Sequence, residues 1–376
     1  MARVLVGMSG GVDSSVAAAL LARAGHDVIG VSLQLYDHSD GGRAARCCSP
    51  EDFLDARRVA AQVGFPYYVI NREERFRTQV LDDFARAYRA GRTPNPCVRC
   101  NAEVKFEALA RLAGELGAAH VATGHFARVT DDPISGERAL RRARDHDKDQ
   151  SYFLFDLEPA HLKVALFPLG ELTKAEVRLE AERLGLATAG KPESQDVCFL
   201  EGGDYRTFLA RHDGEAEPGG EMVDTQGRVV GRHDGISRFT VGQRRGLRLA
   251  SSRRLYVVHV DAATRRVEVG GEDHLDCEGV VVTGLRQAAR APAGPFEALA
   301  QVRYRHPGVP ARIVPRIDGR ADVSFGLPVR GVSPGQAAVF YDGDRVIGGG
   351  WIESTVTHRD AALAGAQSCA LPEAGA

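Results

Sequence analysis

The stretch Gly7-Met8-Ser9-Gly10-Gly11-Val12-Asp13-Ser14-Ser15 decides the fold, because of what lies on either side of it. It follows a β-branched run at residues 4–7 and leads into small apolar residues at 14–24, a helical pattern ended by Gly25. Adjacent glycines let the backbone approach phosphate oxygens, serine hydroxyls donate hydrogen bonds, and the helix turns its positive end to an anion. The stretch therefore predicts a nucleotide-binding loop between a first strand and a first helix.

Asp13 is an acid in a loop that is expected to meet phosphates. Since a carboxylate repels phosphate, we expect a Mg²⁺ ion to bridge Asp13 to the pyrophosphate. The Gly-Lys-Ser/Thr ending of a Walker loop is absent. The alternative is a glycine-rich turn that binds nothing.

Strands and helices alternate through the first 200 residues. Ser49-Pro50-Glu51-Asp52 supplies an N-cap, a proline at the first helical position and early acids for a helix ending near Gly64. The other expected elements are strands at 28–35, 67–70 and 120–123 and helices at 73–90 and 103–116. This alternation predicts an α/β domain over residues 1–204, with a parallel sheet covered by helices and ligands beyond the carboxyl ends of its strands.

From about residue 205 the helical pattern fades and short β-branched runs lie between Gly, Pro and Asp turns. These runs fall at 256–260, 266–269, 279–283, 300–304, 312–314, 321–325 and 337–341. They predict antiparallel β modules: a central linking domain at 205–284 and a C-terminal β-barrel at 285–356. Residues 357–376, rich in Ala and Gly, are expected to be a frayed tail.

Composition limits the class of protein. The chain has 376 residues, is 44% hydrophobic and carries a net charge of −2, which is typical of globular proteins and gives no overall basic signal for nucleic acid. No apolar run reaches the roughly 20 residues of a membrane span, and the start lacks a signal-peptide pattern, so we expect a cytoplasmic protein without a membrane segment. Only five of the 48 basic residues are lysines.

Seven cysteines, an odd number without secretory context, favour reduced thiols over a disulfide framework. Cys97 and Cys100 form a CxxC in a proline-rich loop leading into a helix, where Arg99 and Lys105 favour the thiolate. Cys198 follows in the polar segment 191–199. A CxxC alone is equally half a zinc site, a redox pair or a coincidence, and Cys47 and Cys48 are candidates to complete a metal site. The sequence gives no chemical role to Cys277 and Cys369.

Several motifs occur in one order along the chain. They are Ser9-Gly10-Gly11-Val12-Asp13-Ser14, Gly91-Arg92-Thr93-Pro94-Asn95-Pro96, Cys100-Asn101, Lys105-Phe106, Ala122-Thr123-Gly124-His125, Lys148-Asp149-Gln150-Ser151-Tyr152-Phe153, Cys198-Phe199, Val241-Gly242-Gln243-Arg244 and Ser333-Pro334-Gly335-Gln336-Ala337. The first resembles the loop of the PP-loop ATP pyrophosphatases, which adenylate a substrate oxygen and release pyrophosphate. The whole series, over residues 3–353, resembles the bacterial tRNA-specific 2-thiouridylases.

The resemblance implies a reaction: ATP adenylates the C2 oxygen of the wobble uridine, sulfur replaces it, and AMP and pyrophosphate leave. Cys198 would carry the incoming sulfur as a persulfide. Cys100 would be the partner thiol, releasing sulfide or closing a disulfide with Cys198, and Asp13 would act through the metal. ATP would be bound by Gly7, Met8, Ser9, Gly10, Gly11, Val12, Asp13, Ser14, Leu33 and Gly124. Leu33 is also explained as an ordinary core residue.

The resemblance also implies how tRNA is held. Asn95, Pro96 and Cys97 would contact the flipped uridine. Further tRNA contacts would come from His125, Lys148, Asp149, Gln150, Arg303, Tyr304 and Gln336. For Arg303 and Tyr304, an exposed pair on a barrel strand is the alternative.

The sequence departs from the family at Cys97, where many members carry Asp. Cys97, Cys100 and Cys198 together are enough to ligate a 4Fe-4S cluster with one iron open to sulfide, so persulfide relay and cluster-bound sulfide are rival mechanisms. The partners implied are the tRNAs for Lys, Glu and Gln and a sulfur donor, either a relay protein or a cysteine desulfurase, acting with a monomer. Rival functions are a PP-loop amidating or ligating synthetase and a non-catalytic RNA-binding protein.

Overall fold

The computed structural model describes residues 1–36, 49–132, 136–193, 197–200, 204–213, 217–288, 292 and 294–357. The chain forms two compact units. The first comprises Met1–Phe84, Pro96–Asp213 and Asp344–Val346, and the second comprises Ala85–Asn95, Gly214–Gly343 and Ile347–Ala376. Within the described ranges, no helix is both long and apolar enough to span a bilayer.

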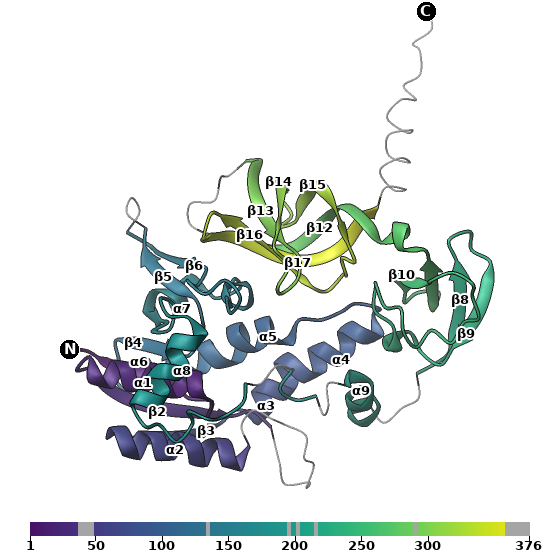
Figure 1. Cartoon of the computed structure of the whole chain (residues 1–376). Coiled ribbons are helices and arrows are strands. Elements are labelled where there is room, and N and C mark those ends of the chain that lie inside the picture. Colours follow the sequence, from purple (N-terminus) through teal and green to yellow (C-terminus); the bar gives the residue numbers. More distant parts are fainter. Residues whose placement is uncertain are drawn as a thin grey trace, which may run out of the picture. The chain divides into compact units, whose positions relative to one another are not determined.

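A five-stranded parallel sheet forms the centre of the first unit (Figure 1). Its order is β3-β2-β1-β4-β7, built from β1 (Arg3–Gly7), β2 (Asp27–Gln34), β3 (Tyr67–Asn71), β4 (His120–Thr123) and β7 (Ala165–Leu166). The parallel sheet that the alternating pattern predicts is confirmed. An antiparallel hairpin, β5 (Arg128–Asp131) and β6 (Arg138–Arg141), was not expected, and its strand β6 pairs at Arg141 with Arg345 near the end of the chain.

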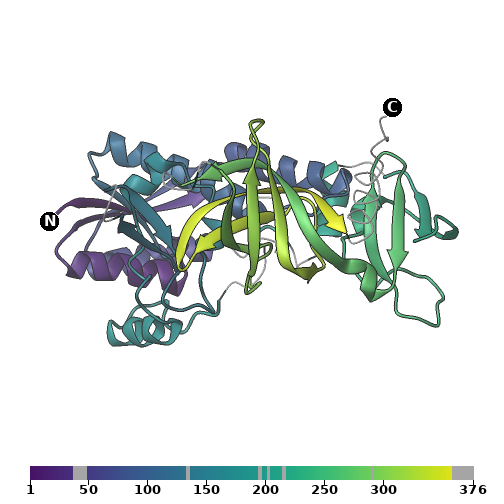
Figure 2. The ribbon, with the colours of Figure 1, turned by 90° about the horizontal axis from the view of Figure 1, so that it is seen from above.

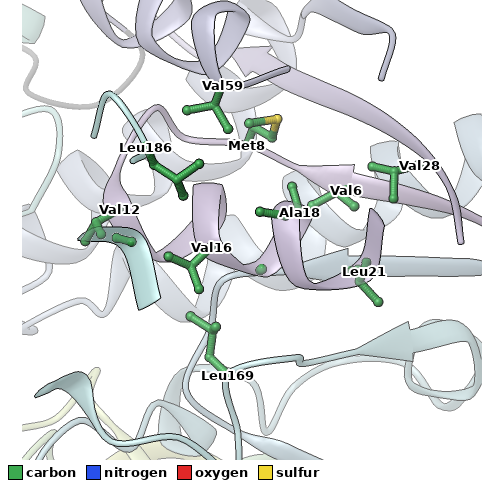
Figure 3. Close-up of a cluster of buried hydrophobic side chains, with 14 of the residues drawn as sticks. Val6, Met8, Val12, Val16, Ala18, Leu21, Val28, Val59, Leu169 and Leu186 are labelled. Carbon is green, nitrogen blue, oxygen red and sulfur yellow. The ribbon is translucent and has the colours of Figure 1, made fainter. Parts of the chain in front are cut away.

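Helices α1 (Val12–Arg23), α2 (Pro50–Val63) and α6 (Glu107–Glu115) pack on the sheet. The other described helices are α3 (Glu73–Phe76), α4 (Asp82–Arg89), α5 (Pro96–Arg99), α7 (Pro159–Val164), α8 (Lys174–Arg183) and α9 (Tyr205–Asp213), with a 3-10 turn η3 (Ser151–Phe153). Val4 and Val6 of β1 share a buried cluster with α1, α2 and α8, whereas a Cβ on Gly7, on the alternate face, would lie 3.0 Å from Leu109 of α6. Helices therefore cover both faces, and Figure 3 shows the first cluster, with Val12, Val16, Ala18 and Leu21 along α1.

Two helices contain π-helical turns that the sequence did not predict. The expected helix at 73–90 is α3, the π turn η1 (Arg77–Leu81) and α4 in succession. The expected helix at 103–116 begins seven residues earlier, because Pro96 starts α5, which continues through the π turn η2 (Cys100–Phe106) into α6. Proline suits a first helical turn because the missing N–H has no partner there in any case.

The second unit begins with a four-stranded sheet of order β10-β11-β8-β9. Its strands are β8 (Gly220–Asp224), β9 (Val229–His233), β10 (Tyr256–Asp261) and β11 (Arg266–Gly270), with 3-10 turns η5 (Ile236–Arg238) and η6 (Glu272–Leu275). Pairing of β11 with β8 is parallel, so the expectation of purely antiparallel modules is wrong at this contact. Met222, Val257 and Val267 lie in its core.

The remaining strands form an antiparallel β-barrel, drawn in green to yellow in Figure 2. Its strands, β12 (Asp276–Gln287), β13 (Phe296–Gln301), β14 (Val309–Pro315), β15 (Ala321–Arg330), β16 (Ala337–Asp342) and β17 (Arg345–Thr357), run in the order β12-β15-β14-β13-β16-β17. Pairing of β12 with β17 closes the barrel. Strand β12 starts at Asp276, inside the stretch that the sequence assigned to the linking domain, and the tail beyond Thr357 lies outside the described residues.

Candidate active site

The loop 8–11 lies at the carboxyl end of β1, beside the carboxyl end of β4, because these strands are parallel neighbours. Gly10 has φ +72°, and a Cβ there would collide with the backbone of Asp52 in α2. A Cβ on Gly124, just after β4, would lie 2.6 Å from the backbone N of Ser14. Both positions therefore need glycine, and Gly124 borders the loop.

The loop meets the requirements of a phosphate-binding turn. Ser9 N donates to Ser14 Oγ at 3.1 Å, and Ser15 Oγ donates to Gly11 O at 2.8 Å, which fixes the backbone. The N-cap of α1 is Gly11, and no side chain caps the helix. Among the residues that the structure describes, a Cβ on Gly11 would meet only Ser9 Oγ, at 3.5 Å, so there is room against the backbone there. First-turn N–H groups without a side-chain cap are suited to an anion, and the loop fits the phosphates of ATP.

The Asp13 carboxylate pairs with a lysine that is 161 residues away in the sequence. Lys174 Nζ, on the first residue of α8, lies 2.6 Å from Asp13 Oδ1 and 3.2 Å from Glu193 Oε1. Burial raises the pKa of Asp13 above its ordinary value, against the opposing effect of the Lys174 charge. A half-buried carboxylate beside a phosphate-binding turn is a suitable Mg²⁺ ligand, so Asp13 fits the metal role expected of it.

The segment leading to Cys198 is tied to this loop by ion pairs. Lys191 Nζ donates to Gly10 O at 3.0 Å and lies 2.7 Å from carboxylate oxygens of both Asp52 and Asp55. Two residues on, Glu193 pairs with Lys148 at 2.7 Å. Burial alone would raise the pKa of Glu193, but the Lys148 hydrogen bond and the nearby Lys174 charge outweigh it and lower that pKa to about 2. The nucleotide loop and the segment before Cys198 thus meet through lysines.

The three candidate thiols lie on neighbouring segments of the first unit. Cys97 is in α5, Cys100 is buried at the start of η2, and Cys198 is partly buried in a turn. Phe199 packs its ring 5.9 Å from Phe76 and 5.1 Å from Phe84, on the helix that also contacts α5 and η2. The expectation of a thiol near a helix N-terminus is confirmed for Cys97.

Metal ligation and the other cysteines are less informative. Among the described side chains, no group of three or more His, Cys, Asp or Glu residues is placed to hold a metal ion. The cluster ligand set of Cys97, Cys100 and Cys198 therefore stays a prediction. Cys277 lies in the barrel core and donates to Gly279 O at 2.8 Å. Cys47, Cys48 and Cys369 lie outside the described residues.

Residues predicted to contact tRNA include several that hold the protein's own backbone. Asp149 is buried and accepts from Arg142 Nη1, Ala143 N and both donors of Ser151. Gln150 Oε1 accepts from Phe126 N at 2.9 Å. His125 bonds Thr123 Oγ1 at 2.8 Å, and burial, with the Lys105 charge, lowers the pKa of His125 to about 3.

Of the other predicted tRNA contacts, Asn95, Arg303, Tyr304 and Gln336 lie in the second unit, whereas Leu33, predicted to contact ATP, lies in the first. Gln336 Nε2 donates to Thr93 O at 3.0 Å and to Pro94 O at 2.9 Å, just before the buried Asn95. The strand expected at 300–304 is wrong at its end: β13 stops at Gln301, and Arg303 and Tyr304 lie in a turn that Arg305 closes with φ +62°. Leu33 is buried at the carboxyl end of β2.

Sequence reasoning missed Lys174, Lys191 and Glu193 as residues of this site. Their partners lie far away in sequence: 161 residues separate Lys174 from Asp13 and 181 separate Lys191 from Gly10. One signal was available. In a chain that uses arginine almost everywhere, lysines at 148, 174 and 191 mark positions where a compact ammonium is needed.

Comparisons with known proteins identify the family of this chain. Family models described as "tRNA methyl transferase HUP domain", "tRNA methyl transferase PRC-barrel domain" and "Aminomethyltransferase beta-barrel domain" match residues 2–202, 206–271 and 279–352. A tRNA-specific 2-thiouridylase MnmA from Geotalea uraniireducens is 50% identical over 364 residues, which is 96% of this chain and 97% of that protein. The chain belongs to the tRNA-specific 2-thiouridylase (MnmA) family.

Other MnmA relatives and solved structures complete the picture. The MnmA of Geobacter metallireducens is 50% identical, over 94% of this chain and 98% of that protein. A 4-thiouridine synthetase solved with RNA and ATP is 15% identical, covering 56% of this chain and 50% of that one at a TM-score of 0.34. The NMN synthetase of Francisella tularensis is 17% identical, covering 58% and 79% at a TM-score of 0.35. These two likenesses are too slight to carry an argument about the reaction.

Proposed function

We propose that this protein uses ATP to replace the C2 oxygen of a tRNA wobble uridine with sulfur, giving 2-thiouridine, AMP and pyrophosphate. The observation that carries the proposal is the convergence, in one unit of an MnmA family member, of a phosphate-binding turn and the segment leading to Cys198, tied together by Lys191 and Glu193.

Different residues would bind the ATP, the metal ion and the uridine. ATP supplies an AMP leaving group for an oxygen that would otherwise not leave. The first turn of α1 binds its phosphates, Asp13 would hold Mg²⁺, and Leu33 and Gly124 would border the nucleoside. Asn95, Pro96 and Cys97 would receive the extruded uridine.

The Cys100 and Cys198 thiols account for the transfer of the sulfur atom and for its electrons. A persulfide on Cys198 has a sulfur–sulfur bond that the Cys100 thiolate can attack. A Cys100–Cys198 disulfide then forms, and the released sulfide attacks C2 as AMP departs. The disulfide must afterwards be reduced by an external dithiol, which supplies two electrons. A 4Fe-4S cluster on Cys97, Cys100 and Cys198 is the rival route, and iron and acid-labile sulfide assays on anaerobically purified active protein separate the two.

Nucleoside mass spectrometry tests the reaction. Unmodified tRNA is incubated with the protein, Mg²⁺-ATP and either a persulfide donor or inorganic sulfide. We expect 2-thiouridine with both sources in the wild type. Cys100→Ser and Cys198→Ser should lose the persulfide-fed reaction by on the order of a thousandfold while keeping the sulfide-fed one, because only the first needs both thiols.

A control and a contrary result complete the test. Cys277→Ala, in the barrel core and outside the site, should thiolate like the wild type with either source. Full turnover of both serine variants with a persulfide donor would contradict the thiol relay, and an amidated product in place of 2-thiouridine would favour a PP-loop synthetase.

The proposed partners follow from the same family. We propose the tRNAs for Lys, Glu and Gln as substrates, a relay protein or cysteine desulfurase as sulfur donor, and a monomer as the working form. The reducing cytoplasm is the compartment that suits an odd set of reactive thiols.

A further inference from the structure

Lys174 is placed as a buried cation on the acid of the nucleotide loop. Its side chain is only 11% exposed, its Nζ lies 2.6 Å from Asp13 Oδ1, and the ring centroid of Phe126 is 5.7 Å from that nitrogen. The backbone is equally fixed, because Lys174 N donates to Asp145 Oδ2 at 2.8 Å. An ammonium in this position neutralises the carboxylate that Mg²⁺ would need.

The two acids that contact Lys174 depend on it unequally. Glu193 has two other cations close by, Lys148 at 2.7 Å and Arg178 at 3.5 Å. Asp13, in the part of the chain that the structure describes, has Lys174 as its sole ion-pair partner. Withdrawal of Lys174 would therefore leave Glu193 neutralised, whereas Asp13 would be a half-buried carboxylate with only the more distant charge of Arg178 to offset it, a costly state.

Lys174 and Mg²⁺ cannot share Asp13 cheaply, since two cations on one half-buried carboxylate repel each other. A metal ion that binds without ATP must displace the Lys174 ammonium from Asp13. The ammonium then has less negative charge near it. A metal that arrives with ATP also brings phosphate oxygens at the adjacent turn, which offer the ammonium a new anionic partner. A flexible four-carbon stem lets the ammonium change partners while α8 stays in place.

We propose that Lys174 is an exchangeable counterion: it holds Asp13 in the nucleotide-free protein, cedes that carboxylate to the divalent cation delivered with ATP, and then pairs with the polyphosphate. This inference rests on the proposed function only in taking ATP and Mg²⁺ as the ligands of the loop. Its consequence is that the loop takes metal and nucleotide together and rejects metal alone.

Metal binding without nucleotide tests the exchange. Mn²⁺, a paramagnetic substitute for Mg²⁺, is titrated into nucleotide-free wild type, Lys174→Met and Lys174→Gln, and free Mn²⁺ is measured by electron paramagnetic resonance. We expect weak binding by the wild type and at least tenfold tighter binding by both variants, because Asp13 is then uncovered. Lys163→Met, an exposed lysine of α7, is the matched control and should bind Mn²⁺ like the wild type.

The second arm measures ATP binding by calorimetry in excess EDTA. Loss of the ammonium should weaken metal-free ATP binding at least tenfold in both Lys174 variants and not in Lys163→Met. Circular dichroism melts establish that each variant is folded. Unchanged Mn²⁺ affinity in the folded Lys174 variants would overturn the exchange.

The two proposals fail differently. If the wild type binds ATP and thiolates tRNA while the Lys174 variants bind Mn²⁺ and metal-free ATP as it does, only the counterion exchange is wrong. If the wild type binds no ATP under any condition, both the counterion exchange and the proposed function are wrong.

Discussion

His125 shows how a single side chain can be fixed in one protonation state. Its ring packs beside those of Phe106 and Phe167, each with its centroid 6.3 Å away, and bonds Thr123 Oγ1. Burial and the Lys105 charge both disfavour the imidazolium, so the pKa of His125 falls to about 3. At neutral pH the ring is an uncharged donor and acceptor, and any contact with tRNA would be a hydrogen bond.

We predict that His125 does not titrate between pH 5 and 8. The measurement is NMR of protein labelled at the histidine ring carbon, with the signal assigned by its loss in His125→Asn. Since the folded-state pKa lies below the ordinary 6.5, protonation favours the unfolded chain, and acidification from about 6.5 toward 3 lowers stability by at most about 1.4 kcal/mol per pH unit from this group. A midpoint between pH 5 and 8 would refute the burial argument.

At this scale the sequence was informative where neighbours in the chain supply the chemistry. Asp13 and Gly10 were predicted because a loop's glycines and acids act locally on a bound phosphate, whereas Gly124 was predicted from the family resemblance. The Lys174 contact with Asp13 could not be predicted, because the partner lies 161 residues away and only the packing of α8 against α1 brings the two together. The buried, internally bonded state of Asp149 is equally a product of packing.

Among the elements, helix α8 begins at a capping box, which determines how the helix is placed at the site. Thr173 Oγ1 accepts from Glu176 N, and Glu176 accepts from Thr173 N, so Lys174 becomes the first residue of the helix. The Thr173 backbone N–H, followed by Arg144, lowers the pKa of Glu176 to about 2. The cap therefore fixes where the helix begins and, with it, the backbone position of Lys174.

We predict that Thr173→Ala costs about 1 kcal/mol of stability, as loss of an N-cap usually does, and weakens ATP binding through Lys174.

We also predict that Glu176→Gln destabilises the protein at pH 6 and that most of this destabilisation is absent at pH 3. The sign follows from a pKa lowered from 4.5 to about 2: the stabilisation is complete above about 4.5 and fades as the pH falls toward 2. Thermal melts at the two pH values, with the exposed Glu182→Gln as control, measure it.

Elements with strong end signals were predictable and those shaped by packing were not. Ser49, Pro50 and Gly64 begin and end α2 as expected, with Gly64 in the left-handed conformation at φ 92°. The π turns η1 and η2 carry no such mark, because a widened turn depends on side chains packed against it and not on local preference. The parallel β11–β8 pairing is likewise a long-range contact that periodicity does not reveal.

At the scale of the whole molecule, the second unit holds a segment from the first half of the chain. Residues Ala85–Asn95 belong to that unit, and the barrel turn 333–336 is hydrogen-bonded to their C-terminal end. Thr93 N donates to Pro334 O at 2.7 Å, and Gln336 Nε2 donates to the carbonyls of Thr93 and Pro94. A Cβ on Gly335, at φ +92°, would lie 2.9 Å from Thr93 O, so the approach requires glycine.

We predict that Gln336→Ala frees this segment. Two hydrogen bonds worth about 0.5–1.5 kcal/mol each are lost, so backbone amides at 91–95 should exchange hydrogen roughly tenfold faster, measured by mass spectrometry of peptides. Thiolation should fall by a similar factor while ATP binding is unchanged, because Asn95 would no longer be presented in one conformation. Gln287→Ala, on the exposed end of β12, should alter neither, and unaltered exchange in Gln336→Ala would show that the turn does not hold the segment.

The first unit also takes its last piece from near the end of the chain. Asp344–Val346 belongs to it, with Asp344 accepting from Arg128 Nη2 at 2.7 Å and from Arg142 N at 2.8 Å, and Arg345 lying 3.4 Å from Asp132. During synthesis, Arg128 of β5 leaves the ribosome about 200 residues before Asp344, the nearer of the two acids that pair with it, a wait on the order of 10–40 s at ordinary elongation rates. A nascent chain thus has a nearly finished nucleotide domain in which Arg128 still lacks this acid, and a message truncated before codon 344 would yield a domain that never forms the Arg128–Asp344 pair.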